Sequence, residues 1–243
     1  MRVEVKSIAL TGWYFLREQL RAPLTLALLV VLPILFVVTA SSVLSDFSRA
    51  LGGNAHGDAA TALAAGWTAA FLAGALGFFQ TMSSHEADQR LALAGLGPAA
   101  AALARLVSAL AMAVTVTAAA FVALRTQQTV PHVAHTLLAM LAYACIYLAI
   151  GTAVGSIIRD ALAGSLAVVF IFLLDVFSGP GMSKGTSGLA TVLSPSQKAG
   201  ELLLAAGAGM SSSSRDWTGA GVSVAVAVAV ALSVFWFAAR RRR

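Results

Sequence analysis

One carboxylate, Asp175, interrupts a long apolar run of the sequence, and an ionisable side chain within a membrane span usually has a function. There it could bind a proton or a substrate, or pair with a cation such as Lys184. A helix that starts at Asp160 would carry Asp175 about 22 Å along its axis, which is within roughly 8 Å of the far edge of a hydrocarbon core about 30 Å thick. At that depth a carboxylate that reaches water or a partner is as plausible as a substrate or proton site, and both interpretations stay open.

Two other stretches resemble ligand sites but lack the required spacing. The segment GPGMSKGTSG (Gly179–Gly188) has Lys184 before Gly185, whereas a phosphate-binding loop needs glycine, then lysine, then a serine or threonine that opens a helix. The histidine pair His132 and His135 has no nearby carboxylate, and two ligands on one helix face need a spacing near four. The sequence predicts neither a nucleotide site nor a metal site, and the histidines are expected to be loop residues.

The sequence offers no nucleophile with catalytic neighbours. Its single cysteine, Cys145, excludes an intrachain disulfide framework and a cysteine zinc site, and is expected to be a small buried apolar side chain. Gly-x-Ser-x-Gly and the paired carboxylates of intramembrane hydrolases are absent from the sequence. We therefore expect no catalytic, cofactor-binding or metal-binding residue, and a chain that is not itself an enzyme.

The composition is that of a membrane protein. Of 243 residues, 59% are hydrophobic and 11% are charged, whereas soluble domains average about 45–50% and about 25%. Mean hydropathy is +0.86. The net charge of +6 owes much to the terminal run Arg240–Arg243, and no basic stripe with interleaved aromatic residues occurs, so nucleic acid is not an expected partner.

Uncharged runs of about 20 residues predict transmembrane helices. We place them at residues 22–45, 59–84, 106–124, 136–158, 161–178 and 217–239. The last run alternates with period two, but it has no turn signals, and a closed barrel needs many such segments, so a helix is favoured. The chain is therefore predicted to be a single all-α membrane domain over residues 1–243. Two motifs of small residues, Gly74-x-x-Gly77 and Gly151-x-x-x-Gly155, would allow helices to approach closely.

Six spans place both termini on one side, and the charges favour the cytoplasmic side of the cell membrane. The inner set of basic residues is then Arg2, Lys6, Arg17, Arg21, Arg90, Arg105, Arg159 and Arg240–Arg243, and the smaller outer set is Arg49, Arg125, Lys184, Lys198 and Arg215. A signal peptide with Leu24–Val38 as its apolar region is the alternative. It is disfavoured because the preceding segment is long and contains Glu4 and Glu18.

Three segments between the spans have their own signals. Residues 1–21 mix charges with aromatic residues and predict a helix in the membrane interface, or a simple anchor before the first span. Residues 85–104 are charged and then apolar through a Gly-x-Gly-Pro turn, which predicts a short helix before the third span. Ser194-Pro195-Ser196-Gln197 is a capping box that predicts an outer helix to about Ala206, with Gly207 as its end signal.

Four stretches in order resemble the permease subunit of ATP-binding-cassette (ABC) exporters of type 2. They are FLREQLRAPLTLALLVVLPILFVV (15–38), EADQRLALAGLGPAAAALAR (86–105), IGTAVGSIIRD (150–160) with the following span that ends in FSG, and GLATVLSPSQKAGELL (188–203). Together they span most of the chain. The region after Gly179 is richer in glycine and serine, and poorer in proline, than is usual in that family.

The resemblance implies a transporter that exports drugs, antibiotics or lipids. It implies a separate ATPase subunit that binds ATP, a second copy of the permease or a homologous permease, and contact with membrane lipids. It also implies that two inner segments touch the ATPase. The coupling candidates there are Arg17, Glu18, Arg21, Glu86, Asp88 and Arg90.

Other functions stay open from the residues alone. An ion-coupled carrier or channel would use Asp175, although such carriers usually contain more intramembrane polar groups and internal repeats. An intramembrane enzyme would need a catalytic constellation that we did not find. A non-transporting sensor or assembly subunit is the remaining alternative.

Overall fold

Helices form every regular element in the described part of the chain. The computed structural model describes residues 23–53, 55, 57–83, 98–158, 160–180, 182, 196–210 and 212–240. The helices are α2 (Pro23–Ala50), α3 (Asp58–Ser83), α5 (Pro98–Gln127), α6 (Val133–Ile157), α7 (Ala161–Ser178), α9 (Gln197–Gly207) and α10 (Ser214–Arg240). The all-α prediction is confirmed, and α10 is a helix despite its alternating sequence.

The helix ends agree with the predicted spans except at α5 and at the end of α2, which continues to Ala50 rather than ending at residue 45. Helix α7 has the predicted bounds, and α3 and α6 differ by a few residues. Helix α5 begins at Pro98, eight residues before the predicted start, so the described part of the predicted inner loop is continuous with the third span and no separate short helix precedes it there. The cause is local: proline suits the first turn of a helix, and the alanines after Pro98 favour its continuation.

Five of the described helices are long and apolar enough to cross a membrane. They are Asp58–Ser83, Val107–Gln127 of α5, Val133–Ile157, Ala161–Ser178 and Ser214–Val234 of α10. Helix α2 is long and apolar enough only when its two pieces, Val30–Thr39 and Ser41–Ala50, are taken together, and these pieces meet at an angle of 42°. The chain is therefore a multi-pass membrane protein, with α2 as either a broken span or a re-entrant segment.

Helix α2 contains two known causes of bending. Pro33 lies inside the helix and cannot donate a backbone hydrogen bond. Thr39, next to the break, donates its hydroxyl to the Leu35 carbonyl at 2.8 Å, a contact that often bends helices. The Thr39 contact lies at the break and accounts for the bend there, whereas Pro33 weakens the helix earlier in the same run.

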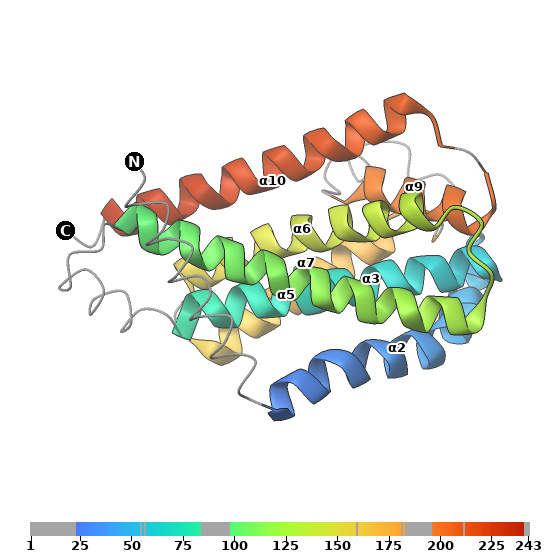
Figure 1. Cartoon of the computed structure of the whole chain (residues 1–243), viewed down its shortest axis with the longest axis horizontal. Coiled ribbons are helices and arrows are strands. Elements are labelled where there is room, and N and C mark those ends of the chain that lie inside the picture. The colour runs from blue at the N-terminus through green and yellow to red at the C-terminus, as the bar shows by residue number, and fades with distance from the viewer. Residues whose placement is uncertain are drawn as a thin grey trace.

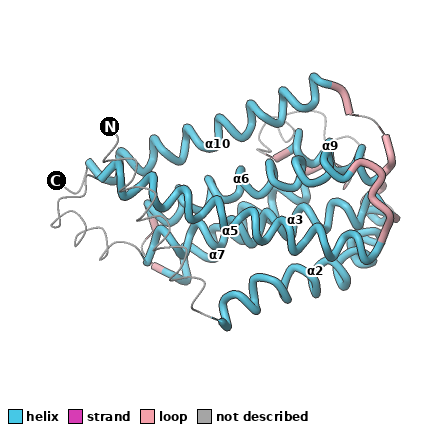
Figure 2. Tube along the Cα trace, in the orientation of Figure 1, coloured by secondary structure: helices cyan, strands magenta, loops and turns pink. Residues whose placement is uncertain are grey.

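The long helices alternate in direction along one bundle (Figure 1). Helices α3, α6 and α10 run one way and α2, α5 and α7 run the other way. The loops that precede α6 and α10 lie at the same end of the bundle (Figure 2), and the short helix α9 lies at that end too. Asp175, near the end of α7, therefore belongs to this end.

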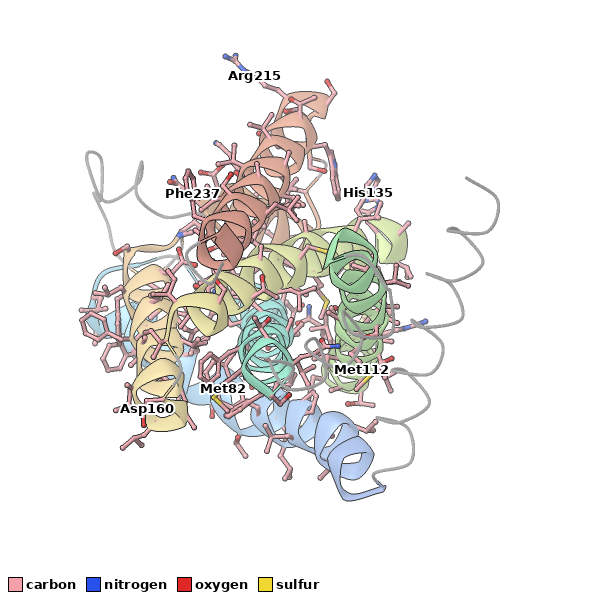
Figure 3. All side chains as sticks on the ribbon, turned by 90° about the vertical axis from the view of Figure 1, so that its left-hand side faces the viewer. Met82, Met112, His135, Asp160, Arg215 and Phe237 are labelled. Atoms are coloured by element: carbon pink, nitrogen blue, oxygen red, sulfur yellow. The ribbon has the colours of Figure 1, made fainter. Side chains whose placement is uncertain are left out.

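Helix α3 occupies the centre of the bundle (Figure 3). It packs against α2, α5, α6, α7 and α9. In the apolar stretch of α3 that could span a membrane, 72% of the residues are buried. A helix that is apolar on all sides suits a central position. Its buried residues are mostly small: Ala60, Ala62, Ala64, Ala65, Gly66, Ala69, Ala70, Ala73, Gly74 and Gly77.

The two predicted small-residue motifs meet each other where α3 and α6 cross. A Cβ at Gly151 would lie 1.9 Å from the Gly74 carbonyl oxygen, and one at Gly155 would lie 2.7 Å from the Phe78 carbonyl oxygen. No Cβ atom is tolerated at such distances, so the backbones touch only because glycine stands at these positions. This crossing fixes the register of α6 on α3.

The outer surface of the bundle is apolar, as expected for contact with lipid. In the apolar stretch of α10 that could span a membrane, only 6% of the residues are buried, and in that of α7 only 28% are buried. Large apolar side chains that are more than half exposed include Leu162, Leu166, Phe170, Val222, Val226 and Phe237.

Candidate functional site

Asp175 is buried inside the bundle rather than open to water. It lies one turn before the end of α7, and its exposed fraction is 4%. Among the described residues it is the one buried aspartate, glutamate, lysine or arginine. A carboxylate that reaches water does not fit this position. A carboxylate that reaches a partner and a substrate or proton site are both compatible with it.

Two hydroxyl groups bond to the same oxygen of Asp175. Tyr147 of α6 donates to Oδ2 at an oxygen–oxygen distance of 2.5 Å. Ser196, which immediately precedes α9, donates to the same Oδ2 atom. Helices α6, α7 and α9 therefore meet at one carboxylate oxygen.

Two further side chains extend this network into α3. The oxygens of Ser196 and Tyr143 are 2.7 Å apart, and the indole nitrogen of Trp67 donates to the Tyr143 hydroxyl at 3.0 Å. A serine hydroxyl has one proton. When Ser196 donates it to Asp175, the Tyr143 hydroxyl donates to Ser196, and a directed chain runs from Trp67 through Tyr143 and Ser196 to Asp175.

Aromatic packing holds the two tyrosines in place. The rings of Tyr143 and Tyr147 lie one helical turn apart and stack with a 5° angle between their planes and centroids 6.0 Å apart. The ring of Phe172, on α7, meets that of Tyr147 edge-on at 5.6 Å. Both tyrosines are fully buried. Ring packing thus orients the Tyr147 hydroxyl toward Asp175 and the Tyr143 hydroxyl toward Ser196.

The sequence pointed to Asp175 but not to its partners. One signal was present: two of the three tyrosines of the chain, Tyr143 and Tyr147, lie four residues apart in one apolar run, which places both hydroxyls on one helix face. Trp67 and Ser196 gave no comparable signal, because their approach depends on how α3 and α9 pack.

No family model matches this sequence, and no curated protein matches it.

Most of the other predicted site residues fall in parts of the chain that the structure does not describe. Arg17, Glu18, Arg21, Glu86, Asp88 and Arg90 lie outside the described residues, as does Lys184, the proposed partner of Asp175. Cys145 is half-buried rather than fully buried.

The histidine pair lies at a shallow cleft at the same end of the bundle. His132 immediately precedes α6, and His135 lies within its first turn, so His135 is not a loop residue. A cleft of about 60 Å³ is lined by His132, His135, Leu202, Ala206, Met210 and Ser212. The described residues contain no group of three or more His, Cys, Asp or Glu side chains placed to hold a metal.

The network can act chemically in two ways. A line of hydroxyls that ends on a carboxylate can pass a proton, and it can also fasten the helices that supply its members. Both uses require the hydrogen bonds to be intact, because a buried polar group without a partner is costly.

Replacing Tyr143 by phenylalanine is expected to destabilise the protein by about 1–3 kcal/mol, because the buried indole N–H of Trp67 loses its acceptor. Thermal unfolding in detergent measures the effect. The control is Thr115→Val, which removes an exposed hydroxyl bonded only within its own helix. Equal melting temperatures for the two variants would show that the Trp67 contact does not stabilise the bundle.

Proposed function

We propose that this chain is the transmembrane permease subunit of an ABC type 2 exporter, which moves amphipathic or hydrophobic substrates such as drugs, antibiotics or lipids across the cell membrane. The observation that carries the proposal is the placement of α9. This short helix follows α7 and precedes α10 in the chain, and it packs against α3 and α6. The family resemblance implies a short outer helix at this point in the order.

In this proposal the protein crosses the membrane six times. Helix α2, with its 42° bend, is the first span, and α3, α5, α6, α7 and α10 are the others. The alternating helix directions are compatible with an even number of crossings. Both chain ends then face the cytoplasm, and α9 lies at the outer end of the bundle.

The energy for transport comes from a partner in this proposal. The sequence has no phosphate-binding loop, so a separate ATPase binds and hydrolyses ATP. The coupling candidates Arg17, Glu18, Arg21, Glu86, Asp88 and Arg90 would contact that ATPase. A second copy of this chain, or a homologous permease, would complete the pathway. Rigid-body motion of packed helices is the established way to transmit such a contact.

The chemistry of the bundle supports an amphipathic or apolar cargo. The helices expose large apolar side chains on the outside, while the buried residues of α3 are mostly small. Apart from the Asp175 network, the described spans offer few buried polar groups that a charged substrate could bind.

Purification with a tagged chain tests the proposal. We expect an ABC-type ATPase to co-purify, and proteoliposomes with both subunits to move a fluorescent lipid or drug only when ATP is present. The double variant Arg17→Glu/Arg21→Glu is expected to reduce transport to the level without ATPase. Arg125→Glu, a charge reversal at the exposed last turn of α5, is the matched control. Transport by the chain alone would overturn the proposal.

An ion-coupled carrier or channel is the second candidate, and the buried hydrogen-bond network at Asp175 favours it. In that case an imposed proton gradient would drive flux through vesicles that contain this chain without nucleotide. The same preparation without an ATPase therefore separates the two candidates.

A further inference from the structure

Helix α9 is a short element with a closely fitted docking site. Its buried face consists of Ala199, Gly200, Leu202, Leu203 and Ala206. Leu203 lies over Gly66 of α3 so closely that a Cβ at Gly66 would be 2.2 Å from the Leu203 Cδ1 atom. At the other end of α9, a Cβ at Gly207 would be 2.8 Å from the Ala59 Cα atom. The helix thus lies flush on the small residues of α3.

The polar attachment of α9 begins at Ser196. This serine occupies the N-cap position, where a hydroxyl normally bonds a backbone N–H of the first turn. Here the Ser196 side chain makes no such bond and donates to Asp175 instead. The Ser196 hydroxyl therefore bonds α7 in place of the first turn of α9. This hydrogen bond ties the start of α9 to Asp175.

The same carboxylate oxygen is the polar link between α7 and α6. Tyr147 donates to the oxygen that accepts from Ser196. Since most of α7 faces away from the bundle, this shared atom joins a loosely packed helix to two others. A displacement of Asp175 therefore loosens α9 and α6 from α7 together.

We propose that Ser196, Tyr147 and Asp175 form a latch that holds α9 docked on α3, and that α9 undocks as one body when the latch opens. The two states differ at one polar junction and along one apolar helix face. Packed elements of this kind move between discrete arrangements rather than deforming gradually.

The latch can be tested through the reactivity of one buried position. Leu203 is fully buried on the face of α9 that packs against α3, so a cysteine placed there reacts with a water-soluble maleimide only when α9 undocks. The test uses Leu203→Cys in a Cys145→Ala background, because Cys145 is the single native cysteine. Mass spectrometry measures the rate of labelling. The maleimide is used at a concentration at which α9 docks again faster than the cysteine reacts, so that the rate reports the fraction of undocked protein.

Adding Ser196→Ala is expected to raise the labelling rate about tenfold, the change that loss of one hydrogen bond to a charged group produces. Tyr147→Phe is expected to raise it as well, and Ser196→Thr, which keeps the hydroxyl, is expected to restore the original rate. The matched control is Ser223→Ala on α10, whose hydroxyl bonds only the Gly219 carbonyl of its own helix. It should leave the rate unchanged.

A second cysteine distinguishes undocking from general unfolding. Met140 of α6 is fully buried in the core, and Met140→Cys should stay unreactive while Leu203→Cys reacts. Equal labelling at the two positions would overturn the proposal, because the whole bundle would then be opening. Unchanged labelling in both Ser196→Ala and Tyr147→Phe would also overturn it.

Discussion

Substitution of Gly151 by alanine is expected to force α3 and α6 apart and to lower the free energy of unfolding by about 1–3 kcal/mol, the usual cost of overpacking. The added Cβ would lie 1.9 Å from the Gly74 carbonyl oxygen and 2.8 Å from the Gly74 carbonyl carbon. Backbone atoms cannot rotate away as a flexible side chain can. Gly151→Leu is expected to have a larger effect, because no space for its side chain exists between the two helices.

Thermal unfolding in detergent measures this loss, and about 2–4 °C per kcal/mol is expected for a chain of this length. Gly221→Ala on α10 is the matched control, since nothing lies within 4 Å of the Cβ it would add. Alanine also favours a helix more than glycine does, so this control should be neutral or slightly stabilising. A Gly151→Ala protein as stable as the control would mean that α3 and α6 do not touch at this point.

The two glycine motifs illustrate what the sequence can and cannot predict. The sequence predicts that helices can approach closely at Gly74-x-x-Gly77 and at Gly151-x-x-x-Gly155. The sequence does not show that the two motifs contact each other, because in an alanine-rich chain many helix faces carry only small residues and could pack closely. The pairing follows from the parallel course of α3 and α6, which places Trp67 beside Tyr143 and Gly74 beside Gly151.

The apolar runs predicted the spans well because length and hydropathy alone define them. Helix ends were less certain where local signals compete. Pro98 was interpreted as part of a turn, yet it lies in the first turn of α5. At α9 the predicted capping box started at Ser194, whereas the helix starts at Gln197. The hydroxyl of Ser196 is engaged by Asp175, a contact that no local pattern encodes.

The sequence predicts the carboxylate of the Asp175 network but not the side chains that bond it. A carboxylate in an apolar run is visible in any sequence, and helix geometry gives its distance along the helix from Asp160. Its partners come from three other parts of the chain, Tyr143 and Tyr147 on α6, Trp67 on α3 and Ser196 before α9. Only the packed bundle brings these together.

Replacing Asp175 by leucine is expected to have the largest effect at the network. Tyr147 and Ser196 would lose their shared acceptor in a buried environment. Ser196 keeps its contact with Tyr143, whereas the Tyr147 hydroxyl is left without an acceptor. A buried group left in this way costs about 1–3 kcal/mol, so the free energy of unfolding should fall by at least that amount. Denaturant unfolding in mild detergent measures it. A leucine variant with wild-type stability would mean that these hydrogen bonds do not stabilise the protein.

The variant Asp175→Asn distinguishes two roles of Asp175, namely holding the helices together by hydrogen bonds and transferring a proton. The asparagine amide oxygen can accept from both hydroxyls, so most of the stability that leucine removes should be retained. An amide cannot take up and release a proton as a carboxyl group does, so a carrier that relies on Asp175 would lose gradient-driven flux in this variant. An exporter powered by an ATPase would keep ATP-dependent transport, because in that mechanism Asp175 holds helices together and moves no ion. A stable Asp175→Asn protein whose ATP-driven transport is lost would require Asp175 to act in the transport cycle itself.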